Sequence, residues 1–138
     1  MRILGLDIGS KRIGVAVSDP LGITAQGLLT LEKGKDTDLI KNLRDIILKE
    51  EIKEIVVGLP LNMNGSYGPQ AKSAISFADN LKDKFDMPVK LWDERMSTME
   101  VERIMIEADV SRAKRKKKID KLAAQVILQS YLNARSHV

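Results

Sequence analysis

Short apolar runs separated by turn residues dominate the first quarter of the chain. Residues 2–8 form an apolar run broken by one acid, and similar runs follow at 13–17 and 25–32. Runs of this kind are typical of β-strands, whereas the segments 9–12 and 18–22 carry glycine, serine and proline and are typical of turns. The pattern predicts three strands that pass back and forth in a meander.

From residue 36 onward, helical periodicity enters the pattern. Apolar residues three and four positions apart predict a helix over 36–50. Further along the chain the pattern predicts two strands, over 54–58 and 88–93, and three helices, over 70–84, 97–108 and 118–135.

The order of these elements predicts an α/β fold. An antiparallel meander that leads into strands alternating with helices gives a mixed sheet of five strands with helices on both faces. The chain has 138 residues, which is enough for one such core and too few for two lobes with a cleft between them. We therefore expect a single domain over residues 1–138.

The composition narrows the chemistry that this fold could perform. There is no cysteine, which excludes disulfides, thiolate zinc sites and cysteine nucleophiles. The one histidine is His137, so a Ser-His-Asp triad is not expected. No apolar stretch approaches the roughly 20 residues that cross a bilayer, and Asp7 interrupts the apolar start. We expect a cytoplasmic protein that has no membrane contact.

The net charge of +4 comes from one segment, residues 112–118, called the basic segment below. Without its six cations the chain has 17 basic and 19 acidic residues, a balance of −2. Such a block favours contact with a polyanion; a solvated loop before the last helix is the alternative. Its six basic residues are Arg112, Lys114, Arg115, Lys116, Lys117 and Lys118.

Asp7 lies inside an apolar strand, in phase with Ile3 and Gly5. An ionised carboxylate there is costly unless it is paired, binds a cation or lies at the open end of the strand. The alternative is a structural role, in which Asp7 caps the following turn through the amides of Ser10 and Lys11.

Glu94 follows the strand predicted over 88–93, at the carboxyl end where α/β sheets place ligands. Asp93 competes with it for such a role. Because successive strand residues point to opposite faces, only one of the two is expected to face a site. The alternative for Glu94 is an exposed ion pair with Arg95.

Asp120 lies on the last predicted helix, on the same face as Ala123, Ala124 and Ile127. The two alanines would let the helix approach the sheet closely and bring the carboxylate with it. The alternative is a favourable position near a helix N-terminus, where acids complement the macrodipole.

Together, Asp7, Glu94 and Asp120 could converge at one end of the sheet. Carboxylates suit hard cations such as Mg²⁺ or Mn²⁺. One or two such ions could serve here, and a pair of them can activate a water and stabilise the leaving oxygen in phosphodiester cleavage. This chemistry needs neither histidine nor cysteine.

Four segments resemble the YqgF family of pre-16S rRNA nucleases and Holliday-junction-resolvase-like proteins. They occur in family order and span the chain: GLDIGSKRIGVAVSD (5–19), VVGLPLNMNGSYGP (56–69), WDERMST (92–98) and KIDKLAAQVILQSYL (118–132). The resemblance implies a ribonuclease-H-like fold and divalent-metal-dependent cleavage of nucleic acid, with Asp7, Glu94 and Asp120 as the acidic site. It also implies a role in trimming the 5′ end of pre-16S rRNA in ribosomal precursor particles.

Basic and aromatic residues near these acids are further candidates for contact with a nucleic acid. Lys11, Arg12 and Arg95 are predicted to contact phosphate, together with the basic segment. The alternatives are a solvated turn for Lys11 and Arg12 and an ion pair with Glu94 or Asp93 for Arg95. Related resolvases carry a second acid on the last helix near Asp120, where this chain has alanines, so a second metal ion is expected to bind weakly. Trp92 is expected in the core rather than as a platform for bases, because aromatic residues make up only 4% of the chain.

Three other functions remain open. A junction-resolving DNA endonuclease would act as a symmetric dimer on structured DNA, so both a monomer and a homodimer are considered. A ribosome-assembly factor would bind RNA without cleaving it. The pattern DxGxxxxG at 7–14 also resembles the phosphate loop of actin-like and sugar-kinase ATPases, but those proteins need two lobes.

Overall fold

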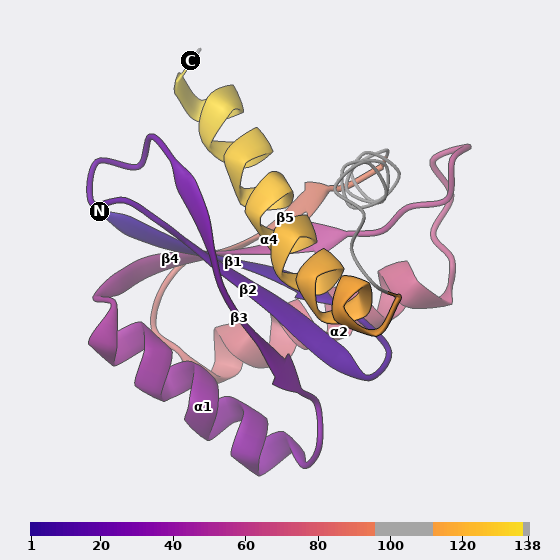
Figure 1. Ribbon diagram of the computed structural model, residues 1–138, viewed down its shortest axis with the longest axis horizontal. Coiled ribbons are helices and arrows are strands. Elements are labelled where there is room, and N and C mark those ends of the chain that lie inside the picture. The colour runs from indigo at the N-terminus through magenta and orange to yellow at the C-terminus, as the bar shows by residue number, and fades with distance from the viewer. Residues whose placement is uncertain (96–111, 137–138) are drawn as a thin grey trace.

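A five-stranded sheet with the order β3-β2-β1-β4-β5 forms the centre of the molecule (Figure 1). The computed structural model describes residues 1–95 and 112–136, with the side chains of 120–135 in its last helix. The strands are β1 (Arg2–Ile8), β2 (Arg12–Ser18), β3 (Ala25–Glu32), β4 (Ile52–Leu59) and β5 (Val89–Asp93). Each lies within two residues of its predicted bounds.

The sheet is mixed, as predicted. β1 pairs antiparallel with β2, and β2 pairs antiparallel with β3. β4 lies parallel to β1 on one side and to β5 on the other. Because β1, β4 and β5 run in the same direction, their carboxyl ends meet at one edge of the sheet.

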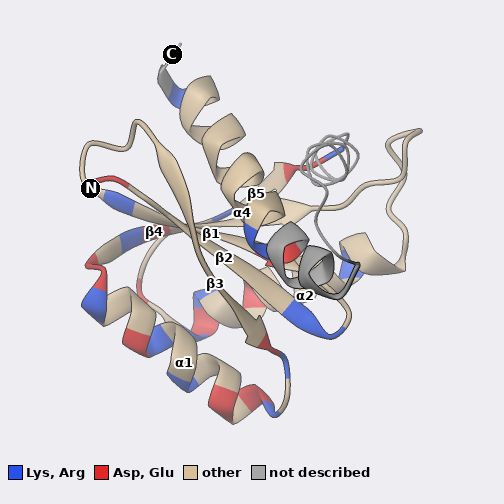
Figure 2. Ribbon diagram, viewed as in Figure 1, with Lys and Arg blue, Asp and Glu red and all other residues tan. Residues whose placement is uncertain are grey.

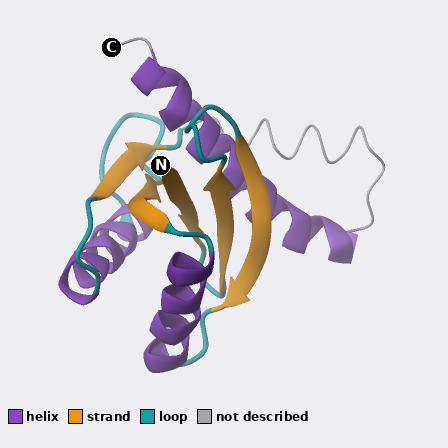
Figure 3. Ribbon diagram, turned by 90° about the vertical axis from the view of Figure 1, so that its left-hand side faces the viewer, coloured by secondary structure: helices purple, strands orange, loops and turns teal. Residues whose placement is uncertain are grey.

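Helices cover both faces of this sheet (Figure 3). α1 (Asp36–Lys49) and α2 (Pro69–Lys84) pack on one face, and α4 (Arg112–Ser136) crosses the other. The apolar residues of β1 divide between the two layers: Leu4 and Leu6 face α1 and α2, whereas Ile3 faces α4. This division follows from the two-residue period of a strand and confirms the predicted architecture.

α1 shows how the pattern of the chain produces this packing. Its apolar stripe includes Leu39, Leu43 and Ile47, all buried against the sheet. Acidic and basic residues lie along the rest of the helix (Figure 2). Burial of one apolar stripe supplies most of the stability of such a helix, which explains why its bounds could be predicted well.

α4 begins at Arg112, six residues before the predicted start at 118. The basic segment therefore forms the first two turns of the helix and is not a loop. It contains no glycine or proline, and alanine, lysine and arginine favour helices, so no local signal stops the helix there. The helix predicted over 97–108 lies outside the described residues. Among the described helices, none combines the length and apolarity that a bilayer crossing requires.

Candidate active site

Asp7 lies near the carboxyl end of β1, on the face covered by α4. Burial is the main cause that raises its pKa, to about 6, and the negative charge of Asp120 adds to the effect. Its carboxyl is hydrogen-bonded to that of Glu94. Among the described residues, Asp7 makes no hydrogen bond to the turn amides at 10 and 11, so the capping alternative is not supported.

Glu94 follows β5 directly, and its N–H donates to the Leu59 carbonyl at 3.2 Å, which extends the pairing of β5 with β4 by one residue. Its Oε2 atom is buried. Burial, followed by the charge of Asp7, raises the pKa of Glu94 to about 8. The two carboxyls therefore hold a proton between them to higher pH than an isolated carboxyl would; these two residues are called the acidic pair below.

Gly58 makes the acidic pair possible. β4 lies between β1 and β5, so the two acids reach each other across the α4 face of β4. A Cβ atom at position 58 would lie 2.1 Å from Glu94 Oε2. Any side chain there would displace the Glu94 carboxyl. Nothing in the sequence singles out this glycine, because only the strand order shows what lies over it.

Asp93 points elsewhere. Its carboxylate binds Arg95, whose Nε lies 2.9 Å from Oδ2 and whose Nη2 lies 2.8 Å from the same oxygen. The Arg95 guanidinium lowers the pKa of Asp93. Only one of the two neighbouring acids thus enters the acidic pair, as expected, and of the two acids considered for Arg95 it is Asp93 that forms the ion pair.

Asp120 is carried to the sheet by a close approach of α4 to β2. A Cβ atom at Gly14 would lie 1.8 Å from the Asp120 carbonyl oxygen. Gly14 pairs with Asp7 in the sheet, so Asp120 lies beside Asp7. The small side chains of Ala123 and Ala124 on α4 are both buried, as predicted for a close approach of this helix to the sheet. Because α4 starts at residue 112, Asp120 lies in its third turn, and the alternative of a helix N-terminus is wrong.

The carboxylate of Asp120 binds Arg12, with Oδ2 2.7 Å from the guanidinium Nε. Within residues 1–95 and 120–135, no three acidic or histidine side chains are arranged to hold one metal ion. Asp7 and Glu94 suit a hard cation, because they are buried oxygen donors that repel each other and share a proton. Asp120 would have to turn away from Arg12 to join them, so the ligand set of three acids stays a prediction.

The basic residues predicted to contact phosphate differ in how close to the acids they lie. Lys11 is exposed in the turn between β1 and β2, and Arg12 begins β2 beside Asp120. Arg95 lies next to the acidic pair in sequence and is held by Asp93. The side chains of the basic segment lie outside the described residues, so their predicted contacts are not tested.

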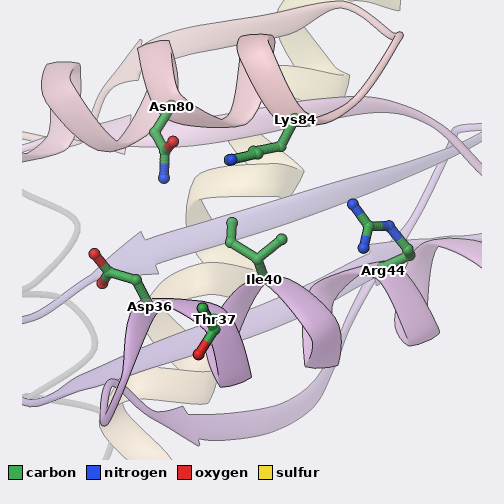
Figure 4. A pocket seen from close by; sticks show the side chains of 6 residues that line it. All are labelled: Asp36, Thr37, Ile40, Arg44, Asn80 and Lys84. Carbon is green, nitrogen blue, oxygen red and sulfur yellow. The ribbon is translucent and has the colours of Figure 1, made fainter.

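One hollow in the surface lies between α1 and α2 (Figure 4). Asp36 and Thr37 lie at one end of it, and Arg44 and Lys84 approach it from the two helices. It lies on the face opposite α4, so the sheet separates it from the acidic pair. We therefore place the candidate site on the α4 side.

Comparisons with known proteins identify the family of the chain. A family model described as "RuvX: Holliday junction resolvase" matches residues 1–134. A relative from Clostridium kluyveri named "Putative pre-16S rRNA nuclease" is 54% identical over 134 residues, covering 96% of this chain and 97% of the relative. A relative of the same name from Geobacillus kaustophilus is 56% identical over 139 residues, covering 98% and 99%.

Two solved structures share the fold at low sequence identity. RuvC from Thermus thermophilus, in complex with a Holliday junction substrate, superimposes with a TM-score of 0.57 at 14% identity, covering 99% of this chain and 96% of that one. The fowlpox virus resolvase in complex with Holliday junction DNA gives 0.55 at 14% identity, covering 98% and 99%. The expected ribonuclease-H-like fold is thereby confirmed.

Proposed function

The chain belongs to the RuvX family of Holliday junction resolvases. We propose that it is a divalent-metal-dependent nuclease that trims the 5′ end of pre-16S rRNA. Family membership and the names of relatives at 54–56% identity make it a nuclease hydrolase. The substrate is RNA of ribosomal precursor particles in the cytoplasm. These finer assignments come from the relatives' names and from the acids described above.

The observation that carries the proposal is the contact of Asp7 with Glu94 across Gly58. Two buried carboxyls that share a proton form a site that a divalent cation would neutralise more effectively than a proton does. Bound Mg²⁺ or Mn²⁺ would supply an activated water and stabilise the leaving oxygen. Asp7 and Glu94 would hold such an ion, and Asp120 is the proposed third ligand.

The basic side chains near the acids would bind the phosphates of the substrate. Arg12 neutralises Asp120 in the free protein, and a phosphate of the bound strand would compete for the same guanidinium. Lys11 is exposed one residue away, and the basic segment extends the positive charge along α4. Binding should therefore depend strongly on salt.

The proposal is tested first with metal alone. Titration with Mn²⁺, followed by electron paramagnetic resonance or calorimetry, should show at least about tenfold weaker binding for Asp7→Asn and Glu94→Gln. Asp93→Asn is the matched control, because it removes a neighbouring carboxylate that the pair does not use, and its affinity should equal that of the wild type. Equal binding by all four proteins would contradict the assignment of the acidic pair.

The second test is cleavage of a 5′-extended small-subunit rRNA fragment with Mn²⁺, Mg²⁺ or a chelator. Cleavage should require metal and disappear in Asp7→Asn and Glu94→Gln. If RNA binds without any metal-dependent cleavage, the non-catalytic assembly factor replaces the nuclease.

A junction-resolving DNA endonuclease is the second candidate, favoured by the description of the family model and by the complexes of the structural neighbours. It predicts symmetric cleavage of a four-way DNA junction by a dimer. Cleavage of the rRNA fragment by a monomer, with the junction left intact, would decide against it.

A further inference from the structure

A second hollow opens beside the acidic pair, between the edge strand β5, α4 and the loop after β4. Its volume is about 490 Å³, within the range of small-molecule sites. Its lining comprises Met63, Trp92, Asp93, Arg95 and Ser130. Asp93 and Arg95 flank Glu94 in the sequence, and Trp92 lies two residues before it, so this hollow, called the β5 pocket below, opens close to the candidate active site.

Trp92 presents a fixed aromatic ring at this pocket. It lies edge-on to Tyr131, with the ring centroids 5.4 Å apart and the planes at 81°. Its Nε1–H donates to Ser130 Oγ at 3.1 Å. Trp92 packs against the core cluster under α4, as expected from the sequence, but it is only partly buried and also lines the pocket.

Met63 faces the same pocket from a well-connected turn. The Gly65 N–H donates to the Asn62 carbonyl, the Asn62 N–H donates to the Ser66 carbonyl, and the Asn62 amide also donates to Ser66 Oγ. At the tip of this turn, Met63 is 65% exposed. A flexible, polarizable thioether in this position can pack against an apolar or aromatic group.

Arg95 supplies a cation in a defined orientation. Asp93 holds its Nε and Nη2, and its Nη1 lies 3.5 Å from where a Cβ atom of Gly65 would be. The guanidinium is therefore fixed between β5 and the turn that carries Met63. A planar, preoriented guanidinium is well suited to a phosphate group.

The distance between Trp92 and Glu94 relates the β5 pocket to the acidic pair. Trp92 and Glu94 lie on the same face of β5, two residues apart, which corresponds to about 7 Å along an extended strand. A strand cleaved at the acidic pair would place its neighbouring nucleotide at Trp92. We propose that the β5 pocket binds the base of that neighbouring nucleotide against Trp92 and Met63, with Arg95 on the adjoining phosphate; this inference rests on the proposed nuclease function.

The test measures binding without cleavage, in a chelator. Trp92 is the only tryptophan of the chain, so its fluorescence reports on this pocket directly. The probes are an eight-nucleotide oligoadenylate and an oligomer of the same length and charge that lacks all bases. Oligoadenylate should quench Trp92 and bind at least about tenfold more tightly than the abasic oligomer, as expected for one or more stacked bases.

Variants distinguish binding of a base in the β5 pocket from binding of the sugar-phosphate backbone alone. Met63→Ala should weaken oligoadenylate about fivefold or more and leave the abasic oligomer unchanged, because only the contact with the base is lost. Arg95→Gln should weaken both oligomers. Leu21→Ala is the matched control, because Leu21 is an exposed apolar residue, 80% accessible, in the β2–β3 turn, and its affinities should equal those of the wild type.

Equal affinity for the two oligomers, or an unchanged affinity of Met63→Ala for oligoadenylate, would overturn the proposal. The result is independent of catalysis. Base-dependent binding in a protein that never cleaves RNA would retain the pocket and refute the nuclease. Metal-dependent cleavage without base-dependent binding would retain the nuclease and refute the pocket.

Discussion

The acidic pair should make the protein less stable as the pH rises, and Glu94→Gln should relieve this effect. Burial and the contact with Asp7 raise the pKa of Glu94 from 4.5 to about 8. Above about pH 4.5 the unfolded chain loses this proton, whereas the folded protein keeps it. The stability that the bound proton provides is full below pH 4.5 and is lost progressively as the pH rises toward about 8.

The size of the effect follows from the same values. A pKa raised from 4.5 to about 8 corresponds to about 5 kcal/mol of unfolding free energy between acidic and alkaline solution. Asp7 shares the repulsion, so the titration belongs to the pair, and relaxation of the site reduces the effect further. We expect Glu94→Gln to be about 2–3 kcal/mol more stable than the wild type at pH 8.5 and nearly equal to it at pH 5.

The assay is urea unfolding in a chelator at pH 5, 7 and 8.5, followed by the fluorescence of Trp92. Asp45→Asn, which alters an exposed carboxylate of α1, is the control and should follow the wild type at every pH. Mg²⁺ should restore stability to the wild type at pH 8.5 and have less effect on Glu94→Gln. A wild type whose stability rises between pH 5 and 8.5, or a variant that gains nothing at pH 8.5, would refute the reasoning.

Three further predictions address packing and charge. Gly58→Ala should displace the Glu94 carboxyl and lower the affinity for Mn²⁺ by about tenfold or more; Gly27→Ala, whose new methyl group meets only a flexible lysine side chain, should leave it unchanged. Tyr131→Phe removes the hydroxyl that donates to the buried Glu54 at 2.6 Å and should cost about 1–3 kcal/mol in urea unfolding; an unchanged unfolding midpoint would contradict this. Replacing two lysines of the basic segment with glutamine should reduce the slope of log K against log salt for RNA by about 2; an unchanged slope would show that the segment does not contact phosphate.

The strands and most helices could be predicted because their signals are local. The two-residue and 3.6-residue periods of apolar positions record which side of each element is buried, and the structure places those sides against the sheet or the helices. Among the described elements, the one boundary that differs by more than two residues is the start of α4. There the run of charged residues offers no apolar periodicity to mark the helix, although arginine, lysine and alanine form helices readily.

The candidate site could be predicted only in part. Asp7 can be identified as a candidate from the sequence because a carboxylate within an apolar strand is costly. Asp120 can be identified because it shares a helix face with small residues. The choice between Asp93 and Glu94 could not be made from the sequence. It depends on which side of β5 faces α4 and on where Arg95 lies.

The elements, their order and the acids that a nuclease could use can thus be identified from the sequence. The tertiary structure decided which atoms meet. Gly14 and Gly58 carry no local signal, because each matters only for the group that packs over it, a helix carbonyl from residue 120 and a carboxyl from residue 94. Contacts between residues so far apart in the chain are set by the strand order and by the crossing of α4, and no local pattern of residues encodes them.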